Sequence, residues 1–412
     1  MTDAICRSCQ AKLGAPLVDL GLQPLANAYL VPGTQAQEKA YPLVVRTCPK
    51  CLLVQADHSV PSDDIFTADY AYFSSYSASW VEHARRYCEA MTARFHLSAT
   101  SKVVEVASND GYLLQHFRAR GVPVLGIEPT AGTAEAAIKK GIATDIAFFG
   151  RDTAHRLAAT GVRADLMAAN NVLAHVPDIG DFIDGFRIML APEGVATFEF
   201  PHLLNLIEKV QFDTIYHEHY SYLSLAAVER ALARAELRVF DVERLPTHGG
   251  SLRLFVCHEV AGHQPMPGLA ATRAAERAAG LDRPDGAAYR DFAPKVEAAR
   301  RSFLAFLASA KSEGKTVAGY GAAAKGNTFL NYCGVGASNM PFVADASHAK
   351  QGRLLPGSHI PVVAPDELLA RHPDYVVILP WNLAEEITRQ LAEVGKWGGR
   401  FVIAIPETRV LP

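Results

Sequence analysis

The stretch VVEVASNDGYLLQHF, Val103–Phe117, decides the fold of this chain. Short β-branched residues lead to Glu105, small residues follow, and Asn109-Asp110-Gly111 passes into an apolar helical pattern. This pattern is typical of a buried parallel strand that turns sharply into a helix. The turn then lies at the carboxyl end of the strand, where open α/β sheets bind ligands, and small side chains there let the backbone approach a ligand closely.

A second apolar strand, residues 122–127, ends in Glu128. An acid about 20 residues beyond such a turn commonly accepts both hydroxyls of a ribose. The spacing E-x-A-x-N-x-G differs from the G-x-G-x-x-G of pyrophosphate binders, and an acid on the first strand suits an ammonium group better than a phosphate. Together these features predict S-adenosylmethionine as the ligand; the alternative is an α/β turn that binds nothing. The predicted donor site comprises Glu105, Ala107, Asn109, Asp110, Gly111, Glu128, Asp145 and Asn171.

The composition indicates a globular protein of two or three domains. The chain has 412 residues, of which 49% are hydrophobic and 20% charged, as in an ordinary soluble enzyme. A net charge of −3 gives no electrostatic reason to expect nucleic acid or an anionic membrane as partner. No apolar run reaches the roughly 18 residues that span a bilayer, and the N-terminus MTDAICRSCQ lacks the features of a signal peptide. We therefore expect a cytoplasmic location.

Four of the seven cysteines form two C-x-x-C pairs, Cys6 with Cys9 and Cys48 with Cys51. This usage is typical of a reducing compartment and a metal rather than of disulfides. Four thiolates complete a tetrahedral zinc shell with no open position, so the predicted zinc is structural. The alternatives are a redox site, two unrelated pairs, or a zinc ribbon that binds nucleic acid. Few Lys or Arg lie between the pairs, which disfavours the ribbon.

Strands and helices alternate from residue 103 to about 258, which predicts a mostly parallel, doubly wound sheet. The expected strands are 103–107, 122–127, 141–144, 165–169, 194–200, 237–242 and 252–257, and a helix is expected over 81–98. Asp145 follows the third strand, where the adenine of the donor would lie. Asn171 follows the fourth strand, beside the methionine end of the donor.

The segment Asp69–Trp80, DYAYFSSYSASW, is rich in aromatic and hydroxyl side chains. Such a surface stacks against sugars or bases and forms hydrogen bonds with them. The alternative is an aromatic seam that joins the N-terminal unit to the next domain. The candidate substrate contacts in this segment include Tyr72, Tyr76 and Ser77.

Two stretches with many polar side chains follow the fourth and fifth strands. Asn170–Pro177 places His175 one helical turn after Asn171, and Glu199–Tyr222 contains the cluster Tyr216-His217-Glu218-His219-Tyr220. The two histidines of the cluster do not form H-E-x-x-H, and no third metal ligand is evident nearby. A histidine of near-neutral pKa can take a proton from an acidified carbon, so we interpret the cluster as holding a general base. A metal site and a solvated polar loop are the alternatives.

A second, smaller α/β unit is expected at the C-terminus. It follows an Ala-, Gly- and Pro-rich connection over 259–292, which reads as mobile with a helix inside, and a helix over 295–311. Its expected strands include 317–319, 375–379 and 400–404.

This unit contains a weak nucleotide-binding fingerprint. Gly319–Ala324 fits G-x-G-x-x-A, and Asp345 ends the next strand. Lys325 and Thr328 lie in the following helical turn, where amides and a cation favour an anion. The candidate roles are a grip on the phosphates of a sugar nucleotide, which we favour, a second nucleotide site, or an inert Rossmann-like turn. His248–Ser251 is interpreted as a simple turn, with a phosphate contact as the alternative.

Together, these motifs resemble the zinc-containing, S-adenosylmethionine-dependent C-methyltransferases of nucleotide-linked deoxysugars, a group that includes the tetronitrose and kijanose C-3′-methyltransferases. The resemblance covers essentially the whole chain and rests on the C-x-x-C pairs, YAYFSSYS, EVASNDGYLL, GIEPT, NNVLAHVPD, IYHEHYSYLS and GYGAAAKGNTFLN. It implies an α/β protein with an N-terminal zinc-binding domain, a central class I methyltransferase doubly wound sheet and a C-terminal Rossmann-like α/β domain. We place these domains at 1–75, 76–260 and 261–412, the last including a linker helix.

The resemblance also implies the substrate, which is a 4-keto-6-deoxy sugar on a nucleoside diphosphate, usually dTDP, and a monomeric protein. His219 matches the family's proposed base, in a cluster with Tyr216 and Glu218, whereas Tyr70 and His175 match residues that line the sugar pocket. Glu105, Gly111, Glu128, Asp145 and Asn171 match positions around the donor. The other expected substrate contacts are Tyr222, Lys325 and Asn327.

The chemistry that this resemblance implies agrees with the residues. A carbonyl at C-4 lowers the pKa of the C-3 proton, which His219 would remove with Glu218 orienting it. The enolate would need hydrogen-bond donors, from Tyr216, Tyr70 or His175. Three rival functions stay open at this point: O- or N-methylation, a zinc-dependent scaffold with a vestigial donor site, and a nicotinamide oxidoreductase that uses Gly319–Ala324.

Overall fold

The structure is a computed structural model, and it describes residues 4–57, 60 and 73–412. The N-terminal part forms a small antiparallel sheet of β1 (Pro16–Pro24), β2 (Ala40–Thr47) and β3 (Val54–Ala56). Its fourth strand, β9 (Ser221–Tyr222), comes from far along the chain and pairs with β3. The sheet therefore holds the segment directly after His219 against the N-terminal unit.

The central sheet has seven strands in the order β10-β11-β8-β7-β4-β5-β6. The strands are β4 (Val103–Val106), β5 (Val124–Ile127), β6 (Thr144–Asp145), β7 (Ala164–Asn170), β8 (Leu190–Pro201), β10 (Leu237–Leu245) and β11 (Ser251–His258). The five strands from β8 to β6 are parallel, and β11 runs antiparallel to both of its neighbours. The predicted mostly parallel sheet is confirmed, with the third strand displaced from 141–144 to 144–145.

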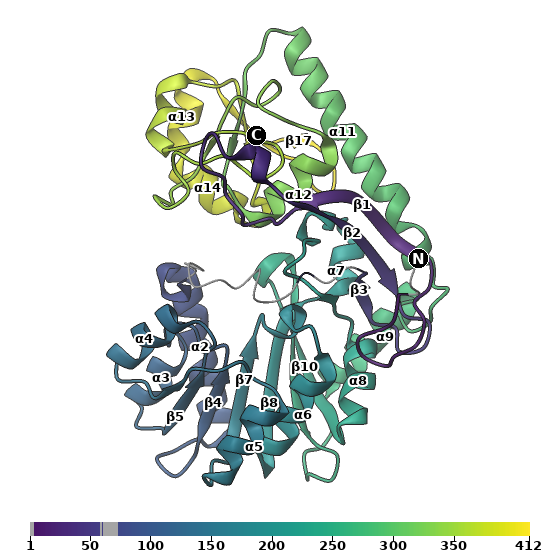
Figure 1. Cartoon of the computed structure of the whole chain (residues 1–412), viewed down its shortest axis with the longest axis vertical. Helices are drawn as coiled ribbons and strands as arrows, with labels where there is room; N and C mark the ends of the chain where they lie inside the picture. Colours follow the sequence, from purple (N-terminus) through teal and green to yellow (C-terminus); the bar gives the residue numbers. More distant parts are fainter. Residues whose placement is uncertain (1–3, 58–59, 61–72) are drawn as a thin grey trace.

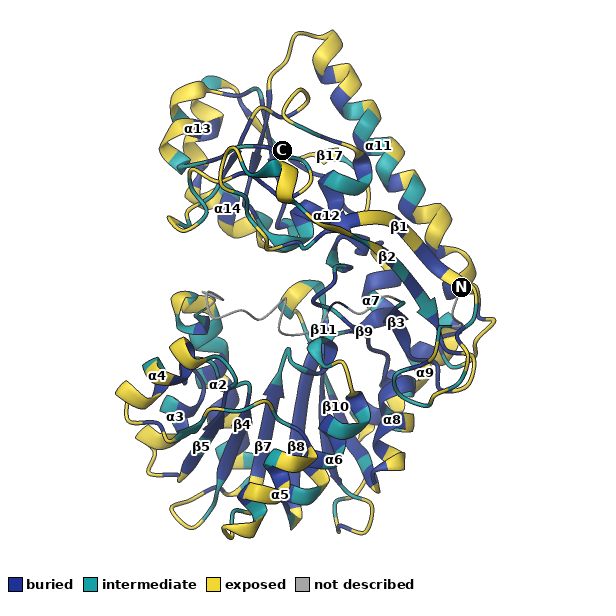
Figure 2. Ribbon diagram, viewed as in Figure 1, coloured by how far each residue is buried: buried dark blue, intermediate teal, exposed yellow. Residues whose placement is uncertain are grey.

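Helices cover both faces of this sheet because its strands are apolar on both sides. Val103 packs in one core cluster with Phe117, whereas Val104 and Val106 pack in another with Phe186. The helices of this part are α2 (Ala78–Phe95), α3 (Leu114–Ala119), α4 (Ala131–Lys139), α5 (Arg151–Ala159), α6 (Ile179–Met189), α7 (Leu203–Glu208) and α8 (Leu225–Arg234). Figure 2 shows the buried strands between the partly exposed helices.

The C-terminal part is a second α/β unit with strand order β14-β13-β12-β15-β16-β17. Its strands are β12 (Val317–Tyr320), β13 (Val343–Ala344), β14 (Val362–Val363), β15 (Tyr375–Ile378), β16 (Arg400–Ile403) and β17 (Arg409–Val410), all parallel except β17. Its helices are α11 (Phe292–Ser312), α12 (Ala324–Cys333), α13 (Pro365–Arg371) and α14 (Ala384–Gln390). The predicted connection over 259–292 contains two helices, α9 (Pro267–Ala279) and α10 (Ala287–Arg290).

Short 3₁₀ turns carry several of the polar residues discussed below. They are η1 (Gln35–Gln37), η2 (Ser74–Tyr76), η3 (Leu173–His175), η4 (Phe212–Thr214), η5 (Thr247–Gly249), η6 (Trp381–Leu383) and η7 (Ala392–Trp397). No helix in the described ranges is both long enough and apolar enough to span a membrane.

The N-terminal sheet joins the two α/β units. In Figure 1 strands β1 and β2 run alongside α11, between the central sheet and the C-terminal unit. Leu43 and Val45 of β2 share one apolar cluster with Phe303 of α11 and Val377 of β15. A shared buried core of this kind is stabilised by the hydrophobic effect over its whole extent, so the N-terminal sheet and the C-terminal unit are held together.

Candidate active site

The donor turn, residues 107–111 after β4, has a strained backbone. Ala107 and Asn109 have positive φ angles of 53° and 50°, which residues other than glycine rarely adopt. Strain of this kind collects at binding and catalytic sites. Gly111 follows at φ 76°, where an added Cβ would lie 2.3 Å from Cδ1 of Ile142. The turn therefore packs too closely against Ile142 to accept a side chain at Gly111.

We expect Gly111→Ala to weaken the binding of S-adenosylhomocysteine by at least about tenfold, because the methyl group strains the backbone and displaces Ile142. Gly121→Ala is the matched control, since Gly121 has φ 75° with nothing within 4 Å of the added Cβ. Calorimetric titration of both variants measures the difference. Equal affinities would show that the close packing of the turn does not shape the donor site.

Buried polar atoms gather at the carboxyl ends of β4 and β7. They include side-chain oxygens of Glu105, Asn170 and Asn171, and the Tyr112 hydroxyl contacts both Glu105 and Asn170. Burial raises the pKa of Glu105 well above its usual value, and the hydrogen bond with Tyr112 opposes this shift. A buried carboxylate with no cationic partner in the described residues favours a nearby cation. The ammonium group of S-adenosylmethionine is such a cation, so these residues fit the predicted donor.

Glu128 lies at the end of β5 and holds the donor turn in place. Its Oε2 accepts a hydrogen bond from the backbone N–H of Asn109 and its Oε1 from that of Thr130, both at 2.9 Å. Each carboxylate oxygen keeps a second acceptor position, which is available to a ribose hydroxyl. The side chain of Asn109 accepts from the backbone N–H of Ser74, so the segment before α2 lies against the turn.

The other two predicted donor carboxylates have partners within the protein. Asp110 forms an ion pair of 2.9 Å with Lys140 and also accepts from the Ser75 hydroxyl. Asp145 forms two hydrogen bonds with Arg156, at 2.5 and 3.1 Å. These contacts stabilise the turn and the end of β6, and a role in donor binding stays a prediction for both residues.

His219 is half-buried in the loop between η4 and β9, which we call the His219 loop, residues 215–220. Its Nδ1 lies 2.7 Å from the backbone carbonyl of Thr214. A carbonyl only accepts, so Nδ1 carries the proton and Nε2 keeps its lone pair. The ring of Tyr216 lies 4.1 Å from that of His219, and the ring of His175 lies 4.6 Å away.

Burial keeps these imidazoles neutral. It lowers the pKa of His219 well below its usual value, and the nearby His175 and Lys325 add to the effect. Burial likewise lowers the pKa values of His175 and His248 to about 4. His175 lies in η3, shortly after Asn171, a predicted donor contact. The structure therefore brings His219 to the edge of the sheet where the donor is predicted.

Glu218 does not contact His219 in the way that we expected. Its Oε1 accepts a hydrogen bond of 2.6 Å from the side chain of Asn27, whereas Thr214 holds His219. The backbone carbonyl of Thr214, rather than the side chain of Glu218, therefore orients His219. The segment is a turn, closed by a hydrogen bond of 2.9 Å from the backbone N–H of His219 to the carbonyl of Tyr216, and the two side chains leave it toward different partners. Burial raises the pKa of Glu218 to about 6.

The aromatic segment is only partly described, because Tyr70 and Tyr72 lie outside the described residues. Tyr76 is 81% exposed and stacks on Phe73. The hydroxyl of Ser77 accepts from the backbone N–H of Trp80 and caps α2. The structure therefore brings neither Tyr76 nor Ser77 to His219. Tyr222 is buried, with its ring 6.3 Å from that of His219.

Lys325 lies at the start of α12 and faces the same region. Its Nζ donates to Asn382 at 2.7 Å and lies 4.8 Å from the centre of the Trp381 ring. Burial lowers the pKa of Lys325, and Asp213 opposes the shift. Trp381 in turn donates to Asp213 at 2.7 Å. Asp213 belongs to η4, which directly precedes the His219 loop, so Trp381 links Lys325 to the start of that loop.

The ligand side of the Gly319–Ala324 turn is filled by the chain itself. The carbonyl of Ala322 accepts from the Tyr29 hydroxyl at 2.5 Å and from Lys350 at 2.7 Å. Asp345, the expected ribose acceptor, accepts from the backbone N–H groups of Ala322 and Ser347. This packing disfavours a second nucleotide site. Asn327 donates to the backbone of Ala26, so this predicted substrate contact joins two parts of the fold.

Some residues of the site carried little or no sequence signal. His248, which we predicted only as part of a turn, has φ 52°, and its Nε2 lies 3.2 Å from the amide of Asn171. Buried Glu199 binds Thr247 and Arg253 and so fixes this turn. Thr214 acts through its backbone, which no motif reveals. No sequence pattern predicts the strained backbone at His248.

The four cysteines of the C-x-x-C pairs converge in the N-terminal unit. All four sulfur atoms lie within 4.8 Å of one another, with Cys6 and Cys51 at 3.5 Å and Cys9 and Cys48 at 3.5 Å. In a tetrahedral site with Zn–S bonds of about 2.3 Å the sulfurs are about 3.8 Å apart. The residues therefore fit one zinc ion.

The fold and the site together define a class I S-adenosylmethionine-dependent methyltransferase. Three family models match the chain in order, namely a zinc binding domain over 6–66, a methyltransferase domain over 80–242 and the C-methyltransferase C-terminal domain over 246–406. The chain is 36% identical to the C-methyltransferase NovU of Streptomyces niveus over 407 residues, which are 98% of this chain and 96% of that protein. The chain therefore belongs to this family of C-methyltransferases, and it uses S-adenosylmethionine and binds zinc.

Two more distant similarities each cover less than half of this chain. The ubiquinone biosynthesis O-methyltransferase of Rhodopseudomonas palustris strain TIE-1 is 24% identical over 156 residues, which cover 33% of this chain and 62% of that protein. The crystal structure of magnesium protoporphyrin IX methyltransferase from Synechocystis PCC 6803 with bound SAH is 14% identical, covers 43% of this chain and 83% of its own, and has a TM-score of 0.34.

Proposed function

We propose that this C-methyltransferase methylates C-3 of a 4-keto-6-deoxy sugar carried by a nucleoside diphosphate, with dTDP as the expected nucleotide and a monomer as the working unit. The observation that carries the proposal is the half-buried, neutral imidazole of His219, whose tautomer is fixed by Thr214. An imidazole with a free Nε2 lone pair is suited to remove a proton from an acidified carbon. A carbonyl beside that carbon is what makes its proton acidic.

In the proposed reaction the residues of this chain remove the proton and stabilise the negative charge that develops. Bound S-adenosylmethionine supplies an electrophilic methyl group. Nε2 of His219 takes the C-3 proton while Nδ1 keeps its hydrogen bond to Thr214. Negative charge then develops on the oxygen at C-4, where a hydrogen-bond donor lowers the barrier. Tyr216 is the described candidate because its ring lies 4.1 Å from His219, and Tyr70 is kept as a candidate from the sequence.

Lys325 is proposed to bind the diphosphate of the substrate. Its side chain is half-buried, and its amine donates to an uncharged amide, that of Asn382. Because burial lowers the pKa of this lysine, an anion beside it would favour its charged form. A diphosphate is such an anion. The nearby carboxyl of Asp213 also favours the charged form of Lys325, although burial raises the pKa of Asp213 itself to about 6. The proposed substrate therefore lies between Lys325 and the His219 loop.

The proposal is tested by proton exchange. We expect purified enzyme in D2O, with a dTDP-4-keto-6-deoxy sugar and S-adenosylhomocysteine, to exchange the C-3 proton for deuterium, and with S-adenosylmethionine to add 14 Da to the sugar at carbon, as read by mass spectrometry and NMR. O- or N-methylation would add the same mass without exchange of a carbon-bound proton. A product methylated on oxygen or nitrogen, or no turnover with any 4-keto sugar nucleotide, would refute the proposal.

A further inference from the structure

A short N-terminal segment, residues 25–31, lies across the C-terminal unit, and we call it the arm. The backbone carbonyl of Ala26 accepts from Asn327 at 2.7 Å, and the hydroxyl of Tyr29 donates to Ala322 at 2.5 Å. Leu30 and Leu354 exchange two backbone hydrogen bonds, of 2.9 and 3.0 Å. These contacts fix the arm to α12, to the Gly-rich turn and to the segment before β14.

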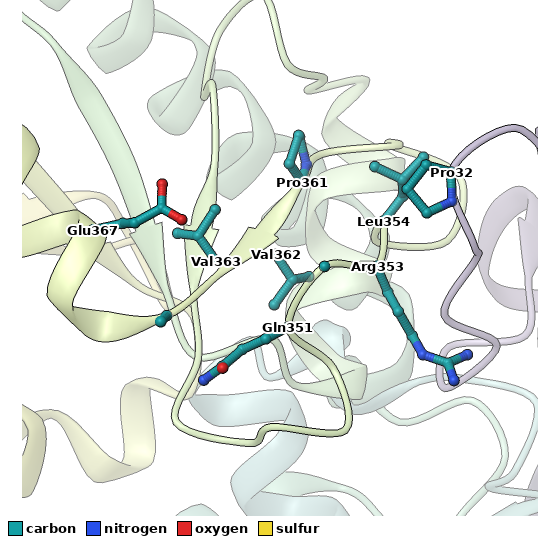
Figure 3. Close-up of a pocket in the computed structure, with 10 residues that line it drawn as sticks. Pro32, Gln351, Arg353, Leu354, Pro361, Val362, Val363 and Glu367 are labelled. Carbon is teal, nitrogen blue, oxygen red and sulfur yellow. The ribbon is translucent and has the colours of Figure 1, made fainter.

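The residue directly after the arm lines a pocket on the same unit. Pro32 lines a cavity of about 500 Å³ together with Arg353, Leu354 and Val362, and Figure 3 shows Pro32 beside Leu354. Farther along, Glu38 accepts from the backbone N–H of Gly357 at 2.7 Å. The arm is thus anchored on both sides of Asn27, and its position follows that of the C-terminal unit.

One side chain of the arm reaches the central part of the protein. Asn27 lies between the anchored residues Ala26 and Tyr29, and its amide donates to Oε1 of Glu218 at 2.6 Å. Glu218 is buried and directly precedes His219, and its backbone forms a hydrogen bond with His175. The contact therefore joins the arm to both imidazoles of the site.

We propose that Asn27 is a positioning residue for the methyl transfer: it binds Glu218 and thereby holds the His219 loop at a fixed place relative to the C-terminal unit. This inference rests on the proposed function of His219. The two reacting partners are then held by different parts of the fold, the donor by the central sheet and the sugar nucleotide by the C-terminal unit. Alignment of two reactants contributes strongly to rate, so the link between these parts affects turnover rather than binding.

The strength of the link depends on the charge of Glu218. A hydrogen bond from an amide to an ionised carboxylate is about twice as strong as one to a neutral acid. Burial raises the pKa of Glu218 to about 6, and the amide of Asn27 acts against this rise. The other titratable groups near Glu218 are Tyr29 on the arm, whose pKa it raises, and the neutral His175 and His219. Below about pH 6 Glu218 takes up a proton and the link weakens.

The experiment compares Asn27→Leu with the wild type. We expect kcat to fall about tenfold, the usual scale for one hydrogen bond to a charged group, while KM for S-adenosylmethionine stays the same. The pKa of Glu218 is expected to rise above its wild-type value, as followed by NMR of carboxyl-labelled glutamate and assigned with Glu218→Gln. This second readout needs no substrate, so it separates failure of this inference from failure of the proposed function.

Two further variants distinguish positioning from general stabilisation. Asn27→Gln keeps the amide and is expected to restore most of kcat. Tyr29→Phe removes another anchor of the arm while the bond from Asn27 to Glu218 stays in place. Because the Tyr29 phenol is uncharged near pH 6, this variant is expected to lower the melting temperature and leave the pKa of Glu218 unchanged. An unchanged kcat and Glu218 pKa in Asn27→Leu would overturn the inference. Equal shifts of the Glu218 pKa in Asn27→Leu and Tyr29→Phe would overturn it as well.

Discussion

His219→Gln is expected to lower kcat at least about a hundredfold, the usual scale for loss of a general base. Glutamine retains a similar polar volume but has no nitrogen lone pair that can take a proton. The predicted donor site does not include this side chain, so the affinity for S-adenosylhomocysteine is expected to stay the same. Steady-state kinetics and calorimetric titration of the same preparation give both quantities.

His217→Gln is the matched control for this variant. His217 is buried in the same loop, two residues away, but its Nε2 lies 3.3 Å from the backbone carbonyl of Pro42 in the N-terminal unit. Its replacement is expected to lower stability more than it lowers kcat. The exchange of the C-3 proton in D2O is expected to disappear in His219→Gln and to persist in His217→Gln. Exchange at the wild-type rate in His219→Gln would show that another group is the base.

The sequence predicted the central sheet well because its strands are buried and regular. Val103–Val106 carries apolar side chains to both faces, and the turn after it keeps the small residues that the strained backbone needs. The N-terminal sheet was not predicted, since β9 is two residues long and pairs with β3 across more than 160 positions of the chain. Local periodicity contains no information on such a contact.

The sequence predicted which residues gather at the site better than it predicted the contacts that each of them makes. The cluster around His219 and the loop with His175 do meet, since both follow neighbouring strands of one sheet. The roles of individual polar residues were harder to predict, because a hydroxyl or amide has many partners within reach. Ser77 caps a helix and Asn327 binds the backbone of Ala26. Such local hydrogen bonds compete with ligand contacts and leave no pattern in the sequence.

Cys48→Ser is expected to release the zinc and to destabilise the N-terminal unit. Structural zinc contributes to folding directly, and a shell that lacks one thiolate binds it far more weakly. We expect about one equivalent of zinc in the wild type and little in the variant by metal analysis, and a melting temperature lower by about 5 °C or more. Cys257→Ser is the matched control, since Cys257 is a buried free cysteine of β11 outside the cluster.

The zinc site is also expected to affect turnover, because it lies next to the strand that supports the His219 loop. Arg7, within the first C-x-x-C pair, donates to the backbone carbonyl of Tyr220 and to the side chain of Gln55 in β3. Tyr220 directly follows His219, and β3 pairs with β9 just beyond it. Loss of zinc frees the backbone around Arg7 and removes one side of this support. Cys48→Ser is therefore expected to lower kcat several-fold with the affinity for S-adenosylhomocysteine unchanged, and zinc retained at wild-type levels would contradict the assignment of Cys48 as a ligand.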